Sequence, residues 1–119
     1  MSSETCHSDS TYEPLTETQY DVSAALFSAL GDPERLKIVH LLVEGGQCVG
    51  YLAEVMGSSM SSVSQRLRIL HAANLIVREK RGKHVFYSLA DEHVAALLRN
   101  GIEHATTPRC GRAVGGKGT

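Results

Sequence analysis

The sequence predicts one mainly α-helical domain that carries a single small β-hairpin. Apolar residues recur every three or four positions in successive segments, which is the spacing of amphipathic helices. Near the C-terminal end the pattern changes to two short β-rich runs joined by a glycine-containing link, and a last helical segment follows. At 119 residues, the chain has the length of one compact domain with one core.

Capping and helix-ending residues divide the first part of this domain into four helices. Ser, Thr and Asp are favoured just before a helix because their side chains accept hydrogen bonds from unpaired backbone N–H groups. Glycine is favoured just after a helix, and proline is tolerated at the first helical position. The expected boundaries are Thr16 or Thr18 to Gly31, Asp32-Pro33 to Gly45-Gly46, Val49 to Gly57, and Ser58 or Ser59 to Asn74.

The segment after the fourth helix predicts a hairpin and a fifth helix. The runs LIVREK and HVFYSL are separated by Arg81-Gly82-Lys83, and Asp91 begins the last helix. Two short helices joined by a tight Gly/Ser turn and followed by a hairpin describe a winged helix-turn-helix. We expect this domain to span residues 16–106, between a disordered arm at 1–15 and a disordered, glycine-rich tail at 107–119.

Charge is distributed unevenly along the chain. The formal net charge is only -1, from 12 basic and 13 acidic residues. Residues 1–34 contain seven acidic residues and no Lys or Arg, whereas residues 59–84 contain six basic residues and one Glu. Such asymmetry indicates a nucleic acid or another anionic partner for the basic stretch, with an ordinary solvated face as the alternative.

The chain also carries signals of its cellular compartment. No apolar run approaches the ~18 residues of a membrane span, and the polar, acidic N-terminal residues do not resemble a signal peptide. We therefore expect a cytoplasmic protein, in which disulfides are uncommon. The three Cys are then expected to be thiols or metal ligands.

The fourth helix is the predicted DNA-reading element. In a helix-turn-helix, the second helix presents the side chains of its N-terminal half to base edges in the major groove. Here these side chains are short hydroxyls, an amide suited to adenine and a guanidinium suited to guanine or phosphate. The hairpin tip could follow the backbone or the minor groove. The predicted DNA-binding residues are Ser61, Ser64, Gln65, Arg68, Arg81 and Lys83.

The fifth helix carries a candidate metal site formed by Asp91, His93 and His104. The two histidines are eleven residues apart, almost a whole number of turns, so they share a face. The rise between them is about 16 Å, so one chain cannot close a coordination shell with all three residues. An antiparallel partner helix would bring its own His104 to this site, which predicts two equivalent sites in a homodimer. A capping Asp with two surface His is the alternative.

Four segments together resemble the ArsR/SmtB family of bacterial metal-responsive repressors. They are LGDPERLKIV, CVGYLA, the recognition helix VSQRLRIL and the wing GKHVFYSL, within a resemblance that covers about residues 22–104. The resemblance implies a homodimer that binds an inverted-repeat operator and releases it on binding an inducer. It also implies base contacts at Ser61, Ser64 and Gln65, with Gln65 in place of the commoner His.

The resemblance extends to two metal sites of the family. The spacing of Asp91, His93 and His104 matches the family's fifth-helix site, whose fourth ligand falls here at Thr107. Water, Glu103 or the tail could replace that ligand.

A second candidate site centres on Cys48, at the family's cysteine position. The family pairs this residue with ligands from the partner's N-terminal arm, where this chain has Cys6 and His7. Thiolates there would favour cadmium, lead or zinc. Gly50 and Tyr51 stand where another ligand often lies, and a lone Cys is often only a small apolar residue. Both interpretations stay open.

The sequence thus predicts a metal-sensing transcriptional regulator. It predicts no enzyme, because the chain has neither an HExxH nor a nucleophile motif. Nitrogen and oxygen ligands suit zinc, which we favour, with nickel or cobalt next. The alternatives are a thiol-based redox or persulfide sensor on the same scaffold, a transcriptional activator, and a winged-helix protein without an inducer.

Overall fold

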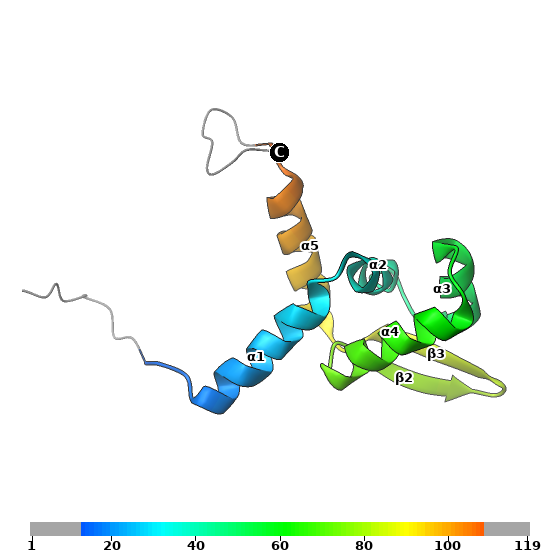
Figure 1. Ribbon diagram of the computed structural model, residues 1–119, viewed down its shortest axis with the longest axis horizontal. Coiled ribbons are helices and arrows are strands. Elements are labelled where there is room, and N and C mark those ends of the chain that lie inside the picture. Colours follow the sequence, from blue (N-terminus) through cyan, green and yellow to red (C-terminus); the bar gives the residue numbers. More distant parts are fainter. Residues whose placement is uncertain (1–12, 109–119) are drawn as a thin grey trace, which may run out of the picture.

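The predicted winged helix-turn-helix is confirmed in a computed structural model that describes residues 13–108. The helix-turn-helix and the β-hairpin wing form one end of the molecule, and the first and last helices lie toward the other end (Figure 1). The helices are α1 (Glu17–Leu30), α2 (Pro33–Leu41), α3 (Val49–Met56), α4 (Met60–Ala72) and α5 (Glu92–Thr106), and the strands are β1 (Gln47–Cys48), β2 (Ile76–Arg81) and β3 (His84–Leu89). No helix in this part of the chain has the length and apolar character needed to cross a membrane.

Four of the five helices begin where capping residues predicted them to begin, and α3 begins at the predicted Val49 without a side-chain cap. Thr16 caps α1, with its hydroxyl accepting a bond from the Gln19 N–H while the Gln19 side chain accepts one from the Thr16 N–H. Asp32, Ser59 and Asp91 cap α2, α4 and α5 in the simpler way, each accepting one backbone N–H bond. These caps fix where each helix starts and therefore which side chains share a face.

The turn between α3 and α4 depends on Gly57. This residue has a φ of 64°, in the left-handed region that favours glycine, and it ends α3. The chain then enters α4 after only Ser58 and Ser59. A tight connection of this kind holds the two helices of a helix-turn-helix together.

The sheet contains one strand that the sequence did not predict. β1 pairs with β3, so the sheet has the order β1-β3-β2 with antiparallel pairing throughout. A two-residue strand is too short to show an alternating pattern in the sequence. The hairpin link is also shorter than expected, because Arg81 belongs to β2 and only Gly82 and Lys83 form the turn.

One aliphatic core joins α4 to the rest of the domain. α4 contributes Val63, Leu67 and Leu70, so its opposite side faces solvent. Packing of this kind is the main source of stability in a small domain, and it fixes the rotation of α4 about its axis. The core also contains Ile38, Val39, Leu42, Leu52, Leu75, Ile76, Val94 and Leu98.

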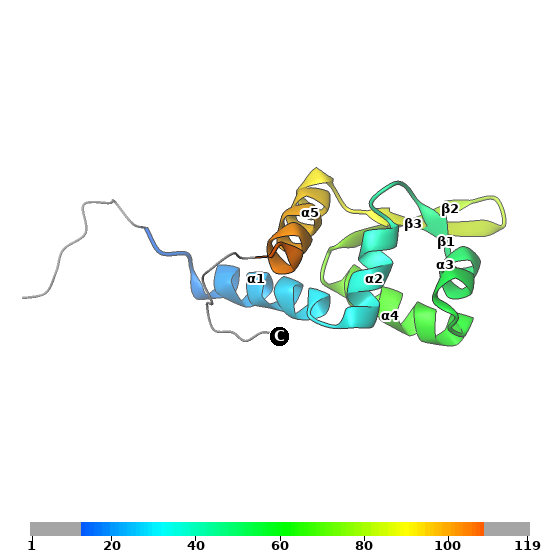
Figure 2. The ribbon, with the colours of Figure 1, turned by 90° about the horizontal axis from the view of Figure 1, so that it is seen from above.

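The first helix leaves most of its apolar side chains uncovered. Only Ala29 of α1 is buried, whereas Val22 and Phe27 expose 61% and 57% of their surface. Leu15 and Tyr20 are also exposed. Figure 2 shows α1 extending away from the helix-turn-helix, with only its C-terminal end against α2. Exposed apolar side chains gathered on one helix indicate a surface that a partner covers.

Arg35 of α2 ties the end of α1 to the core. Its Nε donates to the Ala29 carbonyl at 2.8 Å, and its Nη2 donates to the Ser28 carbonyl at 3.3 Å. A cation at a helix C-terminus satisfies unpaired carbonyls and complements the helix dipole. α1 has no basic residue in its last turn, so the charge comes from the next helix.

Replacing Arg35 with Ala should lower the free energy of unfolding by about 2 kcal/mol, because two hydrogen bonds from a charged group are lost. Urea unfolding at one fixed protein concentration measures this difference. The control is Lys37→Ala, which removes an exposed cation from the same helix. Equal losses in the two variants would show that net charge, and not the contact with α1, causes the effect.

Candidate nucleic-acid and metal sites

The side of α4 away from the core carries the predicted DNA-binding residues of that helix. Ser61, Gln65 and Arg68 are exposed, and Ser64 is half-buried. Ser61 and Gln65 are four residues apart and therefore form one row along the N-terminal half of the helix. A helix that presents short polar side chains from this half has the geometry that base reading in a major groove requires.

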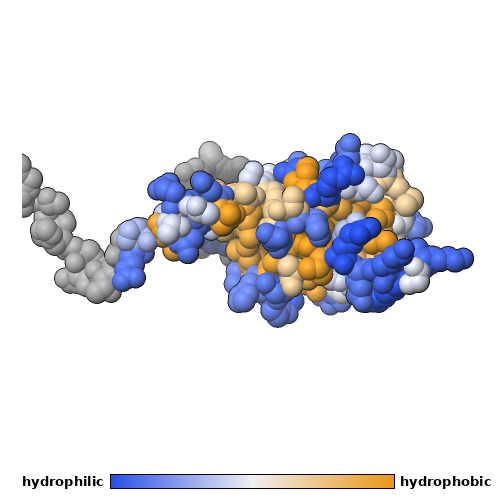
Figure 3. All heavy atoms as spheres, turned by 90° about the horizontal axis from the view of Figure 1, so that it is seen from below, coloured by the Kyte–Doolittle hydropathy of each residue, from blue (hydrophilic) through white to orange (hydrophobic). Residues whose placement is uncertain are grey.

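The wing holds its two predicted DNA-binding residues in different surroundings. Lys83 is exposed in the turn at the tip. Arg81 places Nη2 3.1 Å from Oε1 of Glu79 and its guanidinium carbon 4.7 Å from the centre of the Phe86 ring. Engagement with a carboxylate and a ring leaves Arg81 less available to a phosphate. The hairpin end of the molecule is largely hydrophilic in Figure 3. Both lysines of the wing, Lys80 and Lys83, are exposed and make no ion pair among the described residues.

A polar hollow between α4 and the wing was not predicted from the sequence. It has a volume of about 340 Å³ and is lined by Ser64, Leu67, Arg68, His71, Arg78 and Tyr87. Arg78 and Tyr87 are cross-strand partners in the sheet, and Nε of Arg78 donates to the Tyr87 hydroxyl at 3.3 Å. The sequence marked the basic stretch but gave no sign that these side chains face α4, because the strand register decides which side of the sheet they occupy.

Two of the three predicted metal ligands on α5 lie together. Oδ1 of Asp91 accepts the Val94 N–H at 3.2 Å and lies 3.6 Å from Nδ1 of His93. The His93 side chain is 97% exposed. His104 lies in the last turn of the same helix. Among residues 13–108, no three His, Cys, Asp or Glu side chains come close enough to hold a metal ion. The three predicted ligands of α5 therefore do not come together within one chain.

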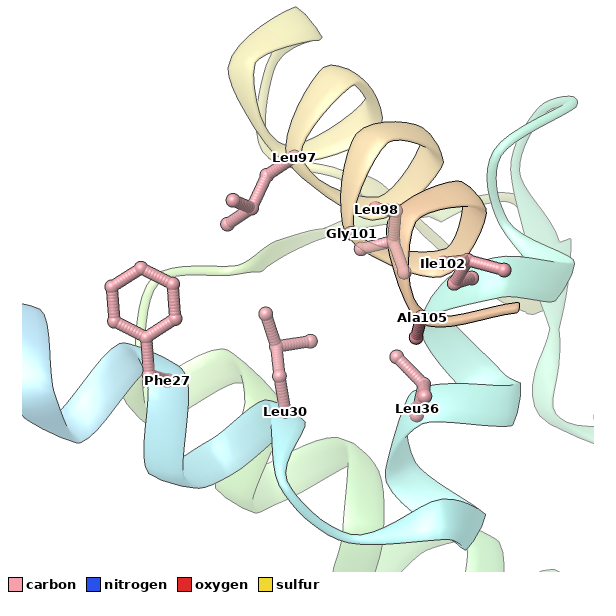
Figure 4. A pocket seen from close by; sticks show the side chains of 8 residues that line it. All are labelled: Phe27, Leu30, Leu36, Leu97, Leu98, Gly101, Ile102 and Ala105. Carbon is pink, nitrogen blue, oxygen red and sulfur yellow. The ribbon is translucent and has the colours of Figure 1, made fainter. Parts of the chain in front are cut away.

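An apolar groove between α1 and α5 borders these predicted ligands. It has a volume of about 220 Å³ and is lined by Phe27, Leu30, Leu36, Leu97, Leu98, Gly101, Ile102 and Ala105. In Figure 4, Phe27 and Leu30 point from α1 toward the side chains of α5. Leu97 lies four residues after His93, so the groove adjoins the face that carries the two histidines.

The remaining predicted ligands give no complete site in the described part of the chain. Cys48 is half-buried at the start of α3, where its side chain makes no capping bond. Cys6 and His7, predicted to act with it, lie outside the described residues. Thr107 stands at the family's fourth-ligand position, and its hydroxyl donates to the Glu103 carbonyl. The Thr107 hydroxyl therefore already makes a hydrogen bond at the end of α5.

Comparisons with known proteins agree with this architecture. Residues 32–77 match the family described as "Bacterial regulatory protein, arsR family". A "Transcriptional repressor SmtB homolog" from Synechocystis sp. is 41% identical over 92 residues, which cover 77% of this chain and 70% of the relative. The "HTH-type transcriptional regulator NmtR" from Mycobacterium tuberculosis is 42% identical over 92 residues, which cover 77% of each chain.

A solved structure extends the likeness to the whole winged domain. It is the homodimeric winged helix-turn-helix DNA-binding domain of a possible ArsR-family transcriptional regulator from Mycobacterium bovis. The likeness has a TM-score of 0.70 at 26% identity and covers 80% of this chain and 92% of that one. These relatives are transcriptional regulators, which confirms the prediction that the chain is not an enzyme. The chain belongs to the ArsR/SmtB family of bacterial transcriptional regulators.

Proposed function

We propose that this protein is a transcriptional repressor that binds operator DNA as a homodimer and releases it when a divalent metal ion binds. One observation carries the proposal. Asp91 caps the start of α5 beside His93, and His104 lies in the last turn of the helix, next to an apolar groove that one chain leaves open. The similar Synechocystis protein is named a transcriptional repressor.

The homodimer is supported by the apolar surface of α1 and α5. Phe27 and Leu97 line a groove that is open on one side, and Val22 of α1 is largely exposed. A second copy related by a twofold axis would cover both grooves at once, because each copy presents the same patch. The similar Mycobacterium bovis domain is a homodimer.

Antiparallel packing of two α5 helices would join the separate parts of the metal site. The start of one helix would then lie beside the end of the other, so Asp91 and His93 would meet His104 of the partner subunit. One carboxylate and two imidazoles fit zinc, with nickel or cobalt next. When bound, the ion supplies coordinate bonds across the subunit interface. Glu103 or water would complete the shell, since the Thr107 hydroxyl is used within its own helix.

Release of DNA would follow from a difference in affinity between two dimer geometries. A ligand shifts an equilibrium only by its preference for one conformation, and the coupling is reciprocal. α5 packs through Val94 and Leu98 on the core that also holds α4. A restraint between two α5 helices therefore restrains the distance between two α4 helices. These must lie about 34 Å apart to enter successive major grooves of an inverted repeat.

His104→Ala should abolish metal-induced release while leaving metal-free DNA binding intact. The reason is that each site in the dimer needs this imidazole from the partner subunit. Fluorescence anisotropy of a labelled operator, titrated with zinc and then with nickel, measures the release. The control is His40→Ala, which removes an exposed imidazole from α2. If either metal still dissociates the His104→Ala dimer from DNA at wild-type concentrations, the α5 site is wrong.

Asp91 is expected to act both as a helix cap and as a ligand, and two substitutions separate these roles. Asp91→Asn should keep the unfolding free energy, because Asn caps helices as well as Asp does, but should weaken metal binding by removing the charge. Asp91→Ala should also cost about 1 kcal/mol of stability. Urea unfolding of the metal-free protein and zinc titration measure the two effects. Unchanged zinc affinity in Asp91→Asn would remove Asp91 from the ligand set.

Substitutions in α4 and in the wing should have different effects on DNA binding, because α4 is proposed to read bases and the wing to contact the backbone. Gln65→Ala should reduce discrimination between operator and mutated operator, because an amide reads a base edge. Lys83→Ala should instead weaken binding to all duplexes and reduce the salt slope by about one, because it removes a phosphate contact. Arg81→Ala should have a smaller effect than Lys83→Ala, since Glu79 and Phe86 engage Arg81. Identical behaviour of the Gln65 and Lys83 variants would contradict the assignment.

A further inference from the structure

We infer that the hollow between α4 and the wing is a phosphate seat, in which Arg68 and Arg78 together hold one backbone phosphodiester of the bound duplex. The inference rests on the proposed DNA-binding function and deepens it. It adds Arg78 as a DNA-binding residue and Tyr87 as a positioning residue, neither of which the sequence pattern singled out.

The lining of the hollow has the chemistry of an anion site. Arg68, His71 and Arg78 supply nitrogen donors, Ser64 supplies a hydroxyl, and no carboxylate lines the space. A guanidinium binds a phosphate through two parallel hydrogen bonds, which a planar fork of donors makes possible. Two guanidiniums that border one space can therefore share a single phosphate group.

Neither arginine of the hollow has an anionic partner among the described residues; Arg66 of α4 also has none, but it does not line the hollow. Within residues 13–108, Arg68 has no ion pair or hydrogen bond to another side chain, and Arg78 bonds only to the neutral Tyr87 hydroxyl. By contrast, Arg81 lies 3.1 Å from Glu79, Arg99 lies 3.9 Å from Glu92, and Arg35 binds two carbonyls at the end of α1. The positive charge beside α4 is thus left for a ligand outside the described chain.

The hollow is built from two elements that meet only in the folded domain. Ser64, Arg68 and His71 follow one another at intervals of four and three residues, so they form one row on α4. Arg78 comes from β2, opposite Tyr87 of β3. The Tyr87 hydroxyl accepts from Nε of Arg78 and so holds one side of the guanidinium. A phosphate bound between the row and the strand would join the recognition helix to the wing.

The position of the hollow favours a backbone phosphate over a base edge. Base-reading side chains come from the N-terminal half of a recognition helix, where Ser61, Ser64 and Gln65 lie, and of these only Ser64 also borders the hollow. The hollow instead borders the row that reaches His71 in the last turn of α4, and its other wall is the wing. Contacts that flank the reading row fix the register of a protein on DNA without reading sequence.

The test begins with an operator selected from a random duplex library by the wild-type dimer. Single neutral methylphosphonates placed along that operator identify the phosphate whose charge matters most to binding near the α4 contact. We expect Arg68→Ala and Arg78→Ala each to weaken binding about tenfold, the loss typical of a hydrogen bond to a charged group. Each should lower the salt slope by up to about one. Arg99→Ala, which removes a cation from α5, should bind as the wild type does.

A double-mutant cycle then assigns the contact. The methylphosphonate at the contacted position should lower the DNA affinity of the wild type about tenfold. It should lower the affinity of Arg78→Ala only a little further, because that variant has already lost the same interaction. Tyr87→Phe should lower DNA affinity less than Arg78→Ala does, and it should cause no further loss of affinity when combined with Arg78→Ala. Arg78→Lys should keep the salt slope but recover only part of the affinity, since Lys lacks the planar fork. If methylphosphonate substitution at every position lowered the affinity of Arg78→Ala as much as that of the wild type, the phosphate seat would be wrong.

The outcomes separate this inference from the function on which it rests. Wild-type affinity in Arg78→Ala, with Gln65→Ala still losing base discrimination, would overturn the seat and leave DNA binding standing. A wild-type dimer that binds no duplex would overturn both. A free phosphate ion offers the same chemistry as a backbone phosphodiester. Inorganic phosphate is therefore titrated into the protein, and its binding is followed by NMR of the Arg78 Nε–H. Phosphate binding that Arg78→Ala abolishes without any change in duplex affinity would assign the hollow to a small anion and overturn the DNA contact.

Discussion

The burial of one side of α4 is the constraint on which the rest of the molecule depends. Val63, Leu67 and Leu70 enter a core shared with α2, α3, β2 and α5, and this fixes the rotation of the helix. Because the aliphatic side of α4 is buried in the core, the row of Ser61 and Gln65 lies on the opposite side and faces solvent. The display of polar groups to DNA is therefore a consequence of hydrophobic packing on the opposite face.

The same core leaves the first and last helices incompletely covered. α1 buries only Ala29, and the groove between Phe27 and α5 is open. The metal ligands proposed on α5 border this open surface, with Asp91 and His104 at opposite ends of one helix. An interface that must form to cover apolar surface is also the place where a ligand can act on two subunits at once. In the proposed function, sensing and dimerisation therefore share one physical cause.

Electrostatics in the wing depends on which cations already have partners. Arg81 is engaged by Glu79 and Phe86 within its own hairpin, whereas Arg78 faces α4 and bonds only to Tyr87 among the described residues. The overall charge of -1 conceals this distinction, as does a simple count of basic residues along the segment. What matters to an anionic ligand is the charge that the fold leaves uncompensated.

The sequence by itself determined the order of the five helices and the hairpin, and most boundaries, because caps and glycines act locally. The end of α2 is an exception, because the helix ends at Leu41 and not at the predicted Gly45-Gly46. Asp32, Ser59 and Gly57 set helix limits through their own backbone neighbours. The sequence also determined that His93 and His104 share a helix face, because they are eleven residues apart, and that Asp91 lies beside His93 at the helix start. Only the tertiary structure decided the strand β1, the engagement of Arg81 and the placing of Arg78 opposite α4. These depend on pairing register and on contacts between segments far apart in the chain, which no local pattern encodes.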